Sequence, residues 1–132
     1  MQDRHLKSVS NAPENSYERG QWAELLALDY LKNNGLEFLE HNYHGPGGEI
    51  DLIMLDKNII VFIEVRYRSS NIYAEAIESI DHRKCERIIK TSQRYLQNHR
   101  WTSRNICRFD VMTVSGSIDN PRIGWIKNAF QA

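Results

Sequence analysis

The sequence predicts a mixed α/β domain built on a small central sheet. Apolar side chains recur at helical spacing in residues 16–34 and 81–99, and three strand-like runs lie between these two segments. A further strand-like run follows the second helical segment. Helices that alternate with strands in this way cover the faces of a sheet. The length of 132 residues fits one such domain with a modest hydrophobic core.

The first helix is predicted over residues 16–34. Asn15 or Ser16 can cap its N-terminus, and Gly35 is a usual stop signal. The side chains expected on its inward side are Ala23, Leu26, Ala27, Tyr30 and Leu31. Residues 1–13 are polar and mixed in charge, and we expect them to form a disordered leader before a single domain over residues 14–132.

Three strands are expected after the first helix, at about residues 36–43, 49–55 and 59–67. The last is the most β-branched run in the chain. Residues 44–48, with the sequence His-Gly-Pro-Gly-Gly, have the composition of a loop. Residues 69–79 are ambiguous.

The second helix is expected to begin at the cap Asp81 and to end near His99. Its buried stripe is expected to comprise Cys85, Ile88, Ile89, Ser92, Tyr95 and Leu96. A basic stripe on another side comprises Arg83, Arg87, Lys90 and Arg94. Residues 106–114 predict a further strand, and residues 122–127 a last short one. Asp110, beside Arg108 on that further strand, is expected to be structural.

Charge and cysteine content restrict the function classes. The net charge is zero, which by itself does not indicate a nucleic-acid binder. Residues 82–108, however, contain eight Lys and Arg against Glu86 alone, a weak indication of an anionic partner. No apolar run reaches the roughly 20 residues of a membrane span. Two cysteines without metal-ligand spacing, Cys85 and Cys107, favour a cytoplasmic protein with free thiols.

A hairpin at Lys57–Asn58 would bring acidic residues together. If these two residues form its loop, Asp56 pairs with Ile59, Asp51 lies opposite Glu64, and Glu49 lies opposite Arg66. These pairs share one face, because side chains alternate along a strand. The other face would comprise Ile50, Leu52, Met54, Val61, Ile63 and Val65.

Two carboxylates about 5 Å apart repel by roughly 3 kcal/mol at an effective dielectric constant near 20. A cation must therefore compensate Asp51 and Glu64. Arg66 and Arg68 could supply it, which would make a salt-bridged surface patch. A bound Mg²⁺ or Mn²⁺ is the other interpretation, since such ions prefer oxygen ligands. Spacing alone leaves both open.

Two further features bear on this choice. Glu24 is flanked by small and apolar residues on the first helix, which is unusual for a solvated carboxylate. It could be a third ligand or orient a water molecule, or it could form a buried salt bridge to Arg66 or Arg68. The glycine-rich loop could let a phosphodiester approach the backbone, or it could be a plain tight turn.

The ordered motifs then resemble a known family. They are Gly48-Glu-Ile-Asp-Leu-Ile53, Val61-Phe-Ile-Glu-Val-Arg-Tyr-Arg68 and Arg108-Phe-Asp-Val111, together with Gly20, Glu24, Asn42, Lys84 and the segment 125–130. In this order they resemble the YraN-like family of uncharacterised bacterial proteins. The resemblance covers nearly all of the chain after Tyr17.

The resemblance implies a restriction-endonuclease-like fold, a mixed central β-sheet flanked by helices. This is the fold of the PD-(D/E)xK superfamily, which includes archaeal Holliday-junction resolvases. It identifies Asp51 as the motif aspartate, Glu64 as the motif acid and Glu24 as the helix glutamate. Position 66 has Arg where the superfamily typically has Lys, and His44 replaces the usual Arg of the loop. Arginine cannot act as a base, although it can hold a scissile phosphate.

The leading hypothesis is therefore a metal-dependent endonuclease that acts on structured or damaged DNA. Asp51 and Glu64 would bind one or two Mg²⁺ or Mn²⁺, Glu24 would assist through water, and Arg66 would contact the phosphate. The residues expected to bind nucleic acid are Arg66, Arg68, Lys84, Arg87, Lys90 and Arg94, and Trp101 could stack on a base. The alternatives are a non-catalytic nucleic-acid-binding module of the same fold and a protein-interaction domain. A homodimer is expected by analogy with resolvases.

Overall fold

Five strands form one mixed sheet in the order β1-β2-β3-β4-β5 in the computed structural model, which describes residues 15–68 and 81–132. The strands are β1 (Glu37–Gly45), β2 (Gly48–Asp56), β3 (Ile59–Arg68), β4 (Ile106–Ser117) and β5 (Asn120–Phe130). The helices are α2 (Ser16–Asn33), α4 (His82–Asn98) and the short 3-10 helix η1 (Arg100–Arg104). Only β3 and β4 run parallel. This is the predicted architecture, a restriction-endonuclease-like mixed sheet with helices. The expected leader and the ambiguous segment 69–79 lie outside the described residues.

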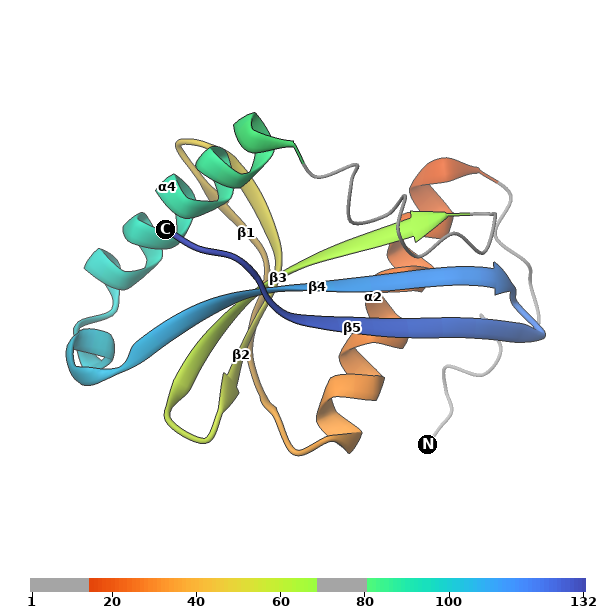
Figure 1. Cartoon of the computed structure of the whole chain (residues 1–132), viewed down its shortest axis with the longest axis horizontal. Coiled ribbons are helices and arrows are strands. Elements are labelled where there is room, and N and C mark those ends of the chain that lie inside the picture. Colours follow the sequence, from red (N-terminus) through yellow and green to blue (C-terminus); the bar gives the residue numbers. More distant parts are fainter. Residues whose placement is uncertain (1–14, 69–80) are drawn as a thin grey trace.

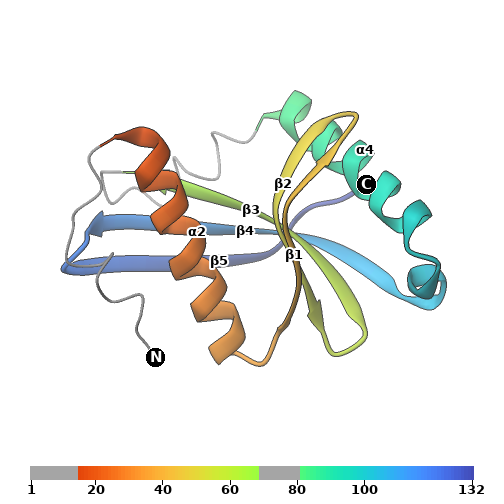
Figure 2. The ribbon, with the colours of Figure 1, turned by 180° about the vertical axis from the view of Figure 1, so that it is seen from behind.

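The two long helices cover opposite faces of the sheet (Figures 1 and 2). On the α2 side, a core cluster comprises Ala27, Leu31, Leu36, Leu52, Met54, Val61, Ile63 and Met112. On the α4 side, a second cluster comprises Ile50, Ile53, Ile60, Phe62, Ile88, Tyr95 and Phe109. Strands β2 and β3 contribute to both clusters, as expected for central strands whose side chains alternate between two covered faces.

The predicted helix ends are confirmed. The Asn15 side chain accepts a hydrogen bond from the Glu18 amide at 2.8 Å, and Asp81 does the same for Lys84 at 2.8 Å. Gly35 follows α2 with a φ of +91°, which favours glycine. Tyr30 is 37% exposed and was wrongly expected to be inward, while Thr91 is buried on α4 and was not predicted.

The β2–β3 hairpin has the predicted register, with Asp56 opposite Ile59 and Leu52 opposite Ile63. Two strand lengths differ from the expectation. Strand β1 continues to Gly45, which leaves only a tight turn of the expected loop, and β5 is an eleven-residue strand rather than a short one. Strand–strand pairing along most of β4 explains the added length of β5.

Buried Asp110 anchors the end of β5, as its expected structural role requires. Its carboxylate accepts hydrogen bonds from Arg108 Nε (3.0 Å), Trp125 Nε1 (2.9 Å) and the Asn128 amide (2.9 Å). Arg108 also pairs with Asp56 Oδ2 at 3.0 Å. A buried charge needs such partners, and here they tie β5 and the β2–β3 turn to β4.

The glycine-rich turn between β1 and β2 packs against α4. A Cβ at Gly45 would come within 2.5 Å of the Thr91 side chain, and one at Gly47 within 2.3 Å of the Arg87 carbonyl oxygen. The Gly47 amide also donates to Thr91 Oγ1 at 3.1 Å. The glycines therefore permit a close approach of hairpin to helix, and of the two interpretations of this loop the structure supports a tight turn.

Candidate metal centre

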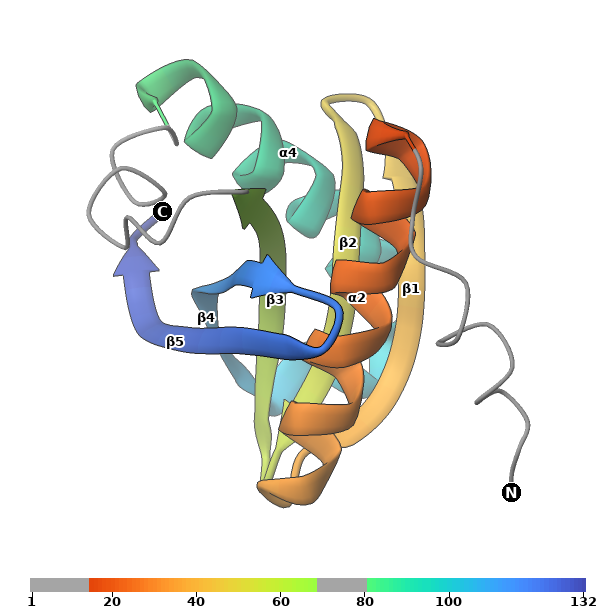
Figure 3. The ribbon, with the colours of Figure 1, turned by 90° about the vertical axis from the view of Figure 1, so that its right-hand side faces the viewer.

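The sheet forks at Asp51. The backbone pairing of β2 with β3 ends at Leu52 and Ile63, whereas β2 stays paired with β1 as far as Gly48. Strand β3 stays paired with β4 as far as Arg68. Figure 3 shows β2 and β3 together at one end and apart at the other. Beyond the last β2–β3 pair, the Asp51 side chain takes over, and its Oδ2 accepts from the Val65 amide at 2.8 Å.

The fork corrects two predictions from the strand register. Glu49 does not lie opposite Arg66, which instead pairs with Thr113 of β4. Ile50 packs with the α4 cluster rather than with Leu52 and Met54. Both differences follow from the β1–β2 hairpin, which leaves β3 and approaches α4 through its glycines. A register count assumes that two strands stay paired, and these do not.

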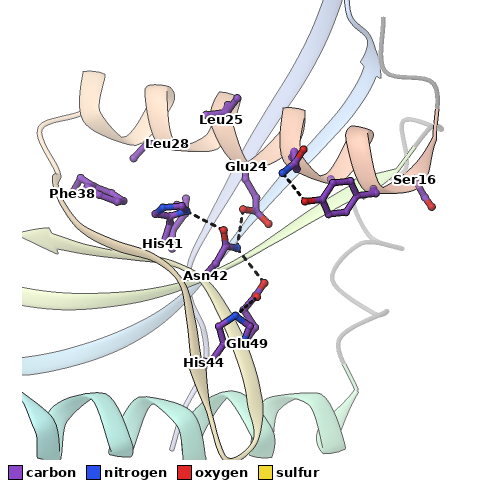
Figure 4. Close-up of a pocket in the computed structure, with 13 residues that line it drawn as sticks. Ser16, Glu24, Leu25, Leu28, Phe38, His41, Asn42, His44 and Glu49 are labelled. Carbon is purple, nitrogen blue, oxygen red and sulfur yellow. Dashed lines mark hydrogen bonds and ion pairs between the residues drawn. The ribbon is translucent and has the colours of Figure 1, made fainter. Parts of the chain in front are cut away.

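Asn42 of β1 holds two carboxylates together (Figure 4). Its Nδ2 donates to Glu24 Oε1 of α2 and to Glu49 Oε1 of β2, both at 3.1 Å. Its Oδ1 lies 2.9 Å from His41 Nδ1, and a proton on that nitrogen would hold the amide with its NH₂ group toward the acids. Asn42 has a φ of +50°, a left-handed conformation that asparagine tolerates better than most residues.

Three carboxylates from α2 and β2 converge at this point. Glu24, Glu49 and Asp51 each offer an oxygen within 4.8 Å of the others. An ion with bonds of about 2.1 Å places opposite ligands roughly 4.2 Å apart, so small side-chain rotations would let one Mg²⁺ or Mn²⁺ bind all three. The donor set, which is made of carboxylate oxygens, also fits these hard ions.

Glu49 was not predicted as a ligand. The signal was present, because Glu49 and Asp51 are two residues apart on one strand and so point to the same side. The register count had given Glu49 a partner on β3 instead. In the structure its Oε2 lies 3.2 Å from His44 Nε2, so His44 is part of this cluster as well.

Glu64 lies on the β3 side of the fork, 5% exposed, where it meets two cations. Its Oε2 lies 3.3 Å from Arg66 Nη1 and 3.2 Å from Lys84 Nζ. Lys84 comes from the first turn of α4, so a basic residue expected only to bind nucleic acid reaches the predicted acidic site. The charge of Glu64 helps to raise the pKa of Asp51, so Glu64 lies next to the three converging carboxylates.

The pKa values of Asp51 and Glu24 are raised in this cluster of acids. Burial, followed by the charge of Glu64, raises the pKa of Asp51 to about 8, against a smaller opposing effect of the Val65 amide. Burial is also the largest cause that raises the pKa of Glu24, and the hydrogen bond from Asn42 opposes it. The site therefore disfavours full ionisation unless a cation joins it.

An open cleft of about 880 Å³ adjoins the carboxylates between α2 and the β1–β2 hairpin. Glu24 and Glu49 form part of its lining (Figure 4), together with Ser16, Tyr17, Gly20, Gln21, Leu25, Leu28, Phe38, His41, Asn42, His44 and Leu52. The rest of that lining is largely apolar and aromatic. The candidate centre is thus accessible from solvent on the side of Glu24 and Glu49.

The remaining predicted residues lie outside the centre. Arg68 Nη1 donates to the Tyr67 carbonyl at 3.1 Å. Arg87, Lys90 and Arg94 are exposed on α4. Arg87 and Lys90 line a shallow groove of about 620 Å³ with the last two residues of the chain. The structure therefore brings together Glu24, Asp51, Glu64, Arg66 and Lys84. It leaves Arg87, Lys90 and Arg94 on the surface of α4 and Arg68 at the end of β3.

No helix in the described part of the chain is long and apolar enough to cross a membrane.

A known protein family matches the region that contains the site. The model of the family described as "Uncharacterised protein family UPF0102" matches residues 23–114, which include Glu24, Asp51, Glu64 and Lys84.

Curated relatives match over almost their whole length. A UPF0102 protein of Stutzerimonas stutzeri is 42% identical over 117 residues, which cover 89% of this chain and 98% of the relative. One of Pseudomonas aeruginosa is 45% identical over 122 residues, with 90% and 97% covered. The protein lpp3065 of Legionella pneumophila is 44% identical over 115 residues, with 87% and 96% covered. The chain therefore belongs to the UPF0102 family, the YraN-like family that its motifs resemble.

Proposed function

We propose that the protein is a metal-dependent endonuclease that hydrolyses phosphodiester bonds in structured or damaged DNA. The observation that carries the proposal is the convergence of Glu24, Glu49 and Asp51 within 4.8 Å at the fork of the sheet. The sheet itself does not need three carboxylates there, because like charges destabilise it. A divalent cation bound to all three carboxylates would offset this repulsion.

Mg²⁺ or Mn²⁺ at this place would polarise the scissile phosphate and make an attacking water molecule more acidic. Glu24, Glu49 and Asp51 would hold the ion, and Asn42 would keep the first two oriented toward it. Glu64 would stay close to the ion through Asp51. The raised pKa of Asp51 means that a proton and a cation compete for the same carboxylate.

Lys84 provides the ammonium group that is missing at position 66. It reaches Glu64 from α4 at 3.2 Å, whereas Arg66 forms an ion pair with the same oxygen at 3.3 Å. A guanidinium keeps its proton, so Arg66 fits a role in holding phosphate charge. A lysine can also give up a proton, so Lys84 suits the positioning of an attacking water as well as charge stabilisation.

The test is a nuclease assay of the full chain with Mn²⁺ on branched, nicked and single-stranded DNA. Asp51→Asn preserves the shape of the side chain and removes its charge, and we expect it to abolish cleavage. Asp29→Asn, which changes an exposed acid on α2, is the matched control. Cleavage that survives in Asp51→Asn would point to a contaminating nuclease and would contradict the proposal.

A second candidate is a nucleic-acid-binding module without catalysis. It is favoured by Glu64, whose Oε2 already has Arg66 and Lys84 as partners. Such a balanced cluster can persist without a metal ion. This candidate predicts salt-sensitive DNA binding that survives in Asp51→Asn, together with no Mn²⁺-dependent cleavage.

A further inference from the structure

The cleft beside the acids gathers exposed apolar side chains. Among the residues described, six large hydrophobic side chains are exposed: Tyr17, Leu25, Tyr30, Phe38, Trp101 and Ile106. Three of them line this one cleft, namely Tyr17 (71% exposed), Leu25 (61%) and Phe38 (41%). Single exposed apolar residues are ordinary, but a group that borders a polar site indicates a ligand surface.

Charges are divided across the candidate centre. The cations that reach it, Arg66 and Lys84, lie at Glu64 on the β3 and α4 side. The cleft lies on the other side, where Glu24 and Glu49 contribute to the lining and Phe38 lies against His41 with ring centroids 5.9 Å apart. A phosphate would meet attraction on the first side and repulsion on the second. A flat, uncharged group fits the second side.

We propose that this cleft binds an unpaired nucleobase next to the scissile phosphate. The proposal rests on the proposed function, and it specifies the substrate class as DNA with an unpaired nucleotide at the cleavage point. The base would stack on the Tyr17 ring, and its amino group would donate to a carboxylate oxygen of Glu49, whereas Phe38 lies at the far end of the cleft (Figure 4). A base inside a duplex is already stacked and paired, and moving it out costs a few kcal/mol.

Volume and access agree with this occupant. A cleft of about 880 Å³ that is open to solvent admits a nucleotide without rearrangement of the sheet. The sugar-phosphate backbone of the DNA could then continue toward Lys84 and α4. Arg87 and Lys90 are exposed along this helix. One nucleotide would thus place its base in the cleft and its phosphate at the cation that the carboxylates would hold.

The experiment uses the full chain with Ca²⁺ in place of Mn²⁺, because Ca²⁺ also binds carboxylate oxygens but does not readily activate water, so that binding is measured apart from cleavage. The probes are two duplexes that differ in one position, where 2-aminopurine is either unpaired or paired. We expect quenching of the unpaired probe only, and binding of that probe about fivefold or more weaker in Tyr17→Ala, the size of one stacking contact. Tyr30→Ala, an exposed aromatic on α2 outside the cleft, is the matched control.

Several results would overturn the proposal. They are equal affinity for the two probes, a loss confined to Trp101→Ala, and a wild-type dimer in sedimentation that Phe38→Ala converts to a monomer. The last result would mean that a second copy covers the cleft. Cleavage with Mn²⁺ but without preference for the unpaired base would remove this inference and leave the endonuclease. Preference for the unpaired base without any cleavage would contradict the endonuclease proposal and leave the binding of a base in the cleft.

Discussion

Lys84 Nζ lies 3.2 Å from Glu64 Oε2, so helix α4 delivers a cation to a buried carboxylate of strand β3. The two residues are 20 positions apart, and they meet because Asp81 caps α4 and starts the helix beside the fork. Next to them, position 66 has an arginine that cannot replace a lysine in proton transfer. The pair is therefore the first place to test whether the centre is catalytic.

Replacement of Lys84 by alanine is expected to lower the rate of Mn²⁺-dependent cleavage by about 100-fold or more, the effect of removing one donor from developing negative charge. Lys84→Arg keeps the charge and is expected to recover only part of the rate. Single-turnover kinetics with saturating DNA measure the chemical step. Lys32→Ala, an exposed lysine on α2, is the control. Equal rates in Lys84→Ala and wild type would assign the lysine a purely structural role.

Replacement of Asn42 by glycine is expected to weaken Mn²⁺ binding by about 10-fold or more, because the amide that orients Glu24 and Glu49 is lost. Glycine accepts the φ of +50°, so the backbone should be preserved. Electron paramagnetic resonance of free Mn²⁺ gives the affinity without any nuclease assay. The control is Asn128→Gly, at another left-handed asparagine (φ +54°). Wild-type affinity in Asn42→Gly would contradict the orienting role.

The pKa of Asp51 gives a pH prediction with a definite sign. The folded value of about 8 lies above the ordinary value of 3.8, so the folded state binds this proton more tightly than the unfolded chain does. The metal-free protein should therefore lose stability as the pH rises from about 4 to 8, and the loss should level off above 8. Urea unfolding at several pH values measures it. Asp51→Asn should flatten the profile, and an unchanged slope in that variant would assign the effect to other groups.

Added Mn²⁺ should reverse the sign of that pH dependence. A metal ion needs the deprotonated carboxylate, so the stabilisation that it provides should grow as the pH approaches 8. The same urea titrations with and without Mn²⁺ give the difference.

Replacement of Gly47 by alanine is expected to destabilise the fold by about 1–3 kcal/mol, because the new Cβ would meet the Arg87 carbonyl oxygen and push the hairpin away from α4. Gly20→Ala is the contrasting control. It has no heavy atom within 4 Å of the added Cβ, and alanine in a helix should stabilise by about 0.5–1 kcal/mol. Chemical denaturation of both variants checks the prediction, and a neutral Gly47→Ala would show that the hairpin adjusts freely.

Local rules were enough to predict the elements and part of the site. Caps at Asn15 and Asp81 and the Lys57–Asn58 turn are short-range features, and the structure confirms them. The register counted from this turn also predicted that Asp51 and Glu64 are neighbours. Long-range features were missed. Glu49 depends on where β2 leaves β3, and Lys84 depends on how α4 crosses the sheet. The two-residue spacing of Glu49 and Asp51 places both on one side of β2, but it does not show where β2 leaves β3, and no spacing shows that Lys84 reaches Glu64. The assignment of Glu24 needed the family resemblance.

The fork at Asp51 has a mechanical consequence. The β1–β2 hairpin and the β3–β5 strands are joined by backbone pairing only up to Leu52 and Ile63, and beyond that point by the contact of Asp51 with the Val65 amide. A cation bound by α2 and β2 beside Glu64 would add a second connection between the β1–β2 hairpin and strands β3–β5. Binding of a divalent ion should then slow hydrogen exchange at the Val65 amide. Ion binding could thus be detected in the backbone of the sheet without any cleavage of DNA.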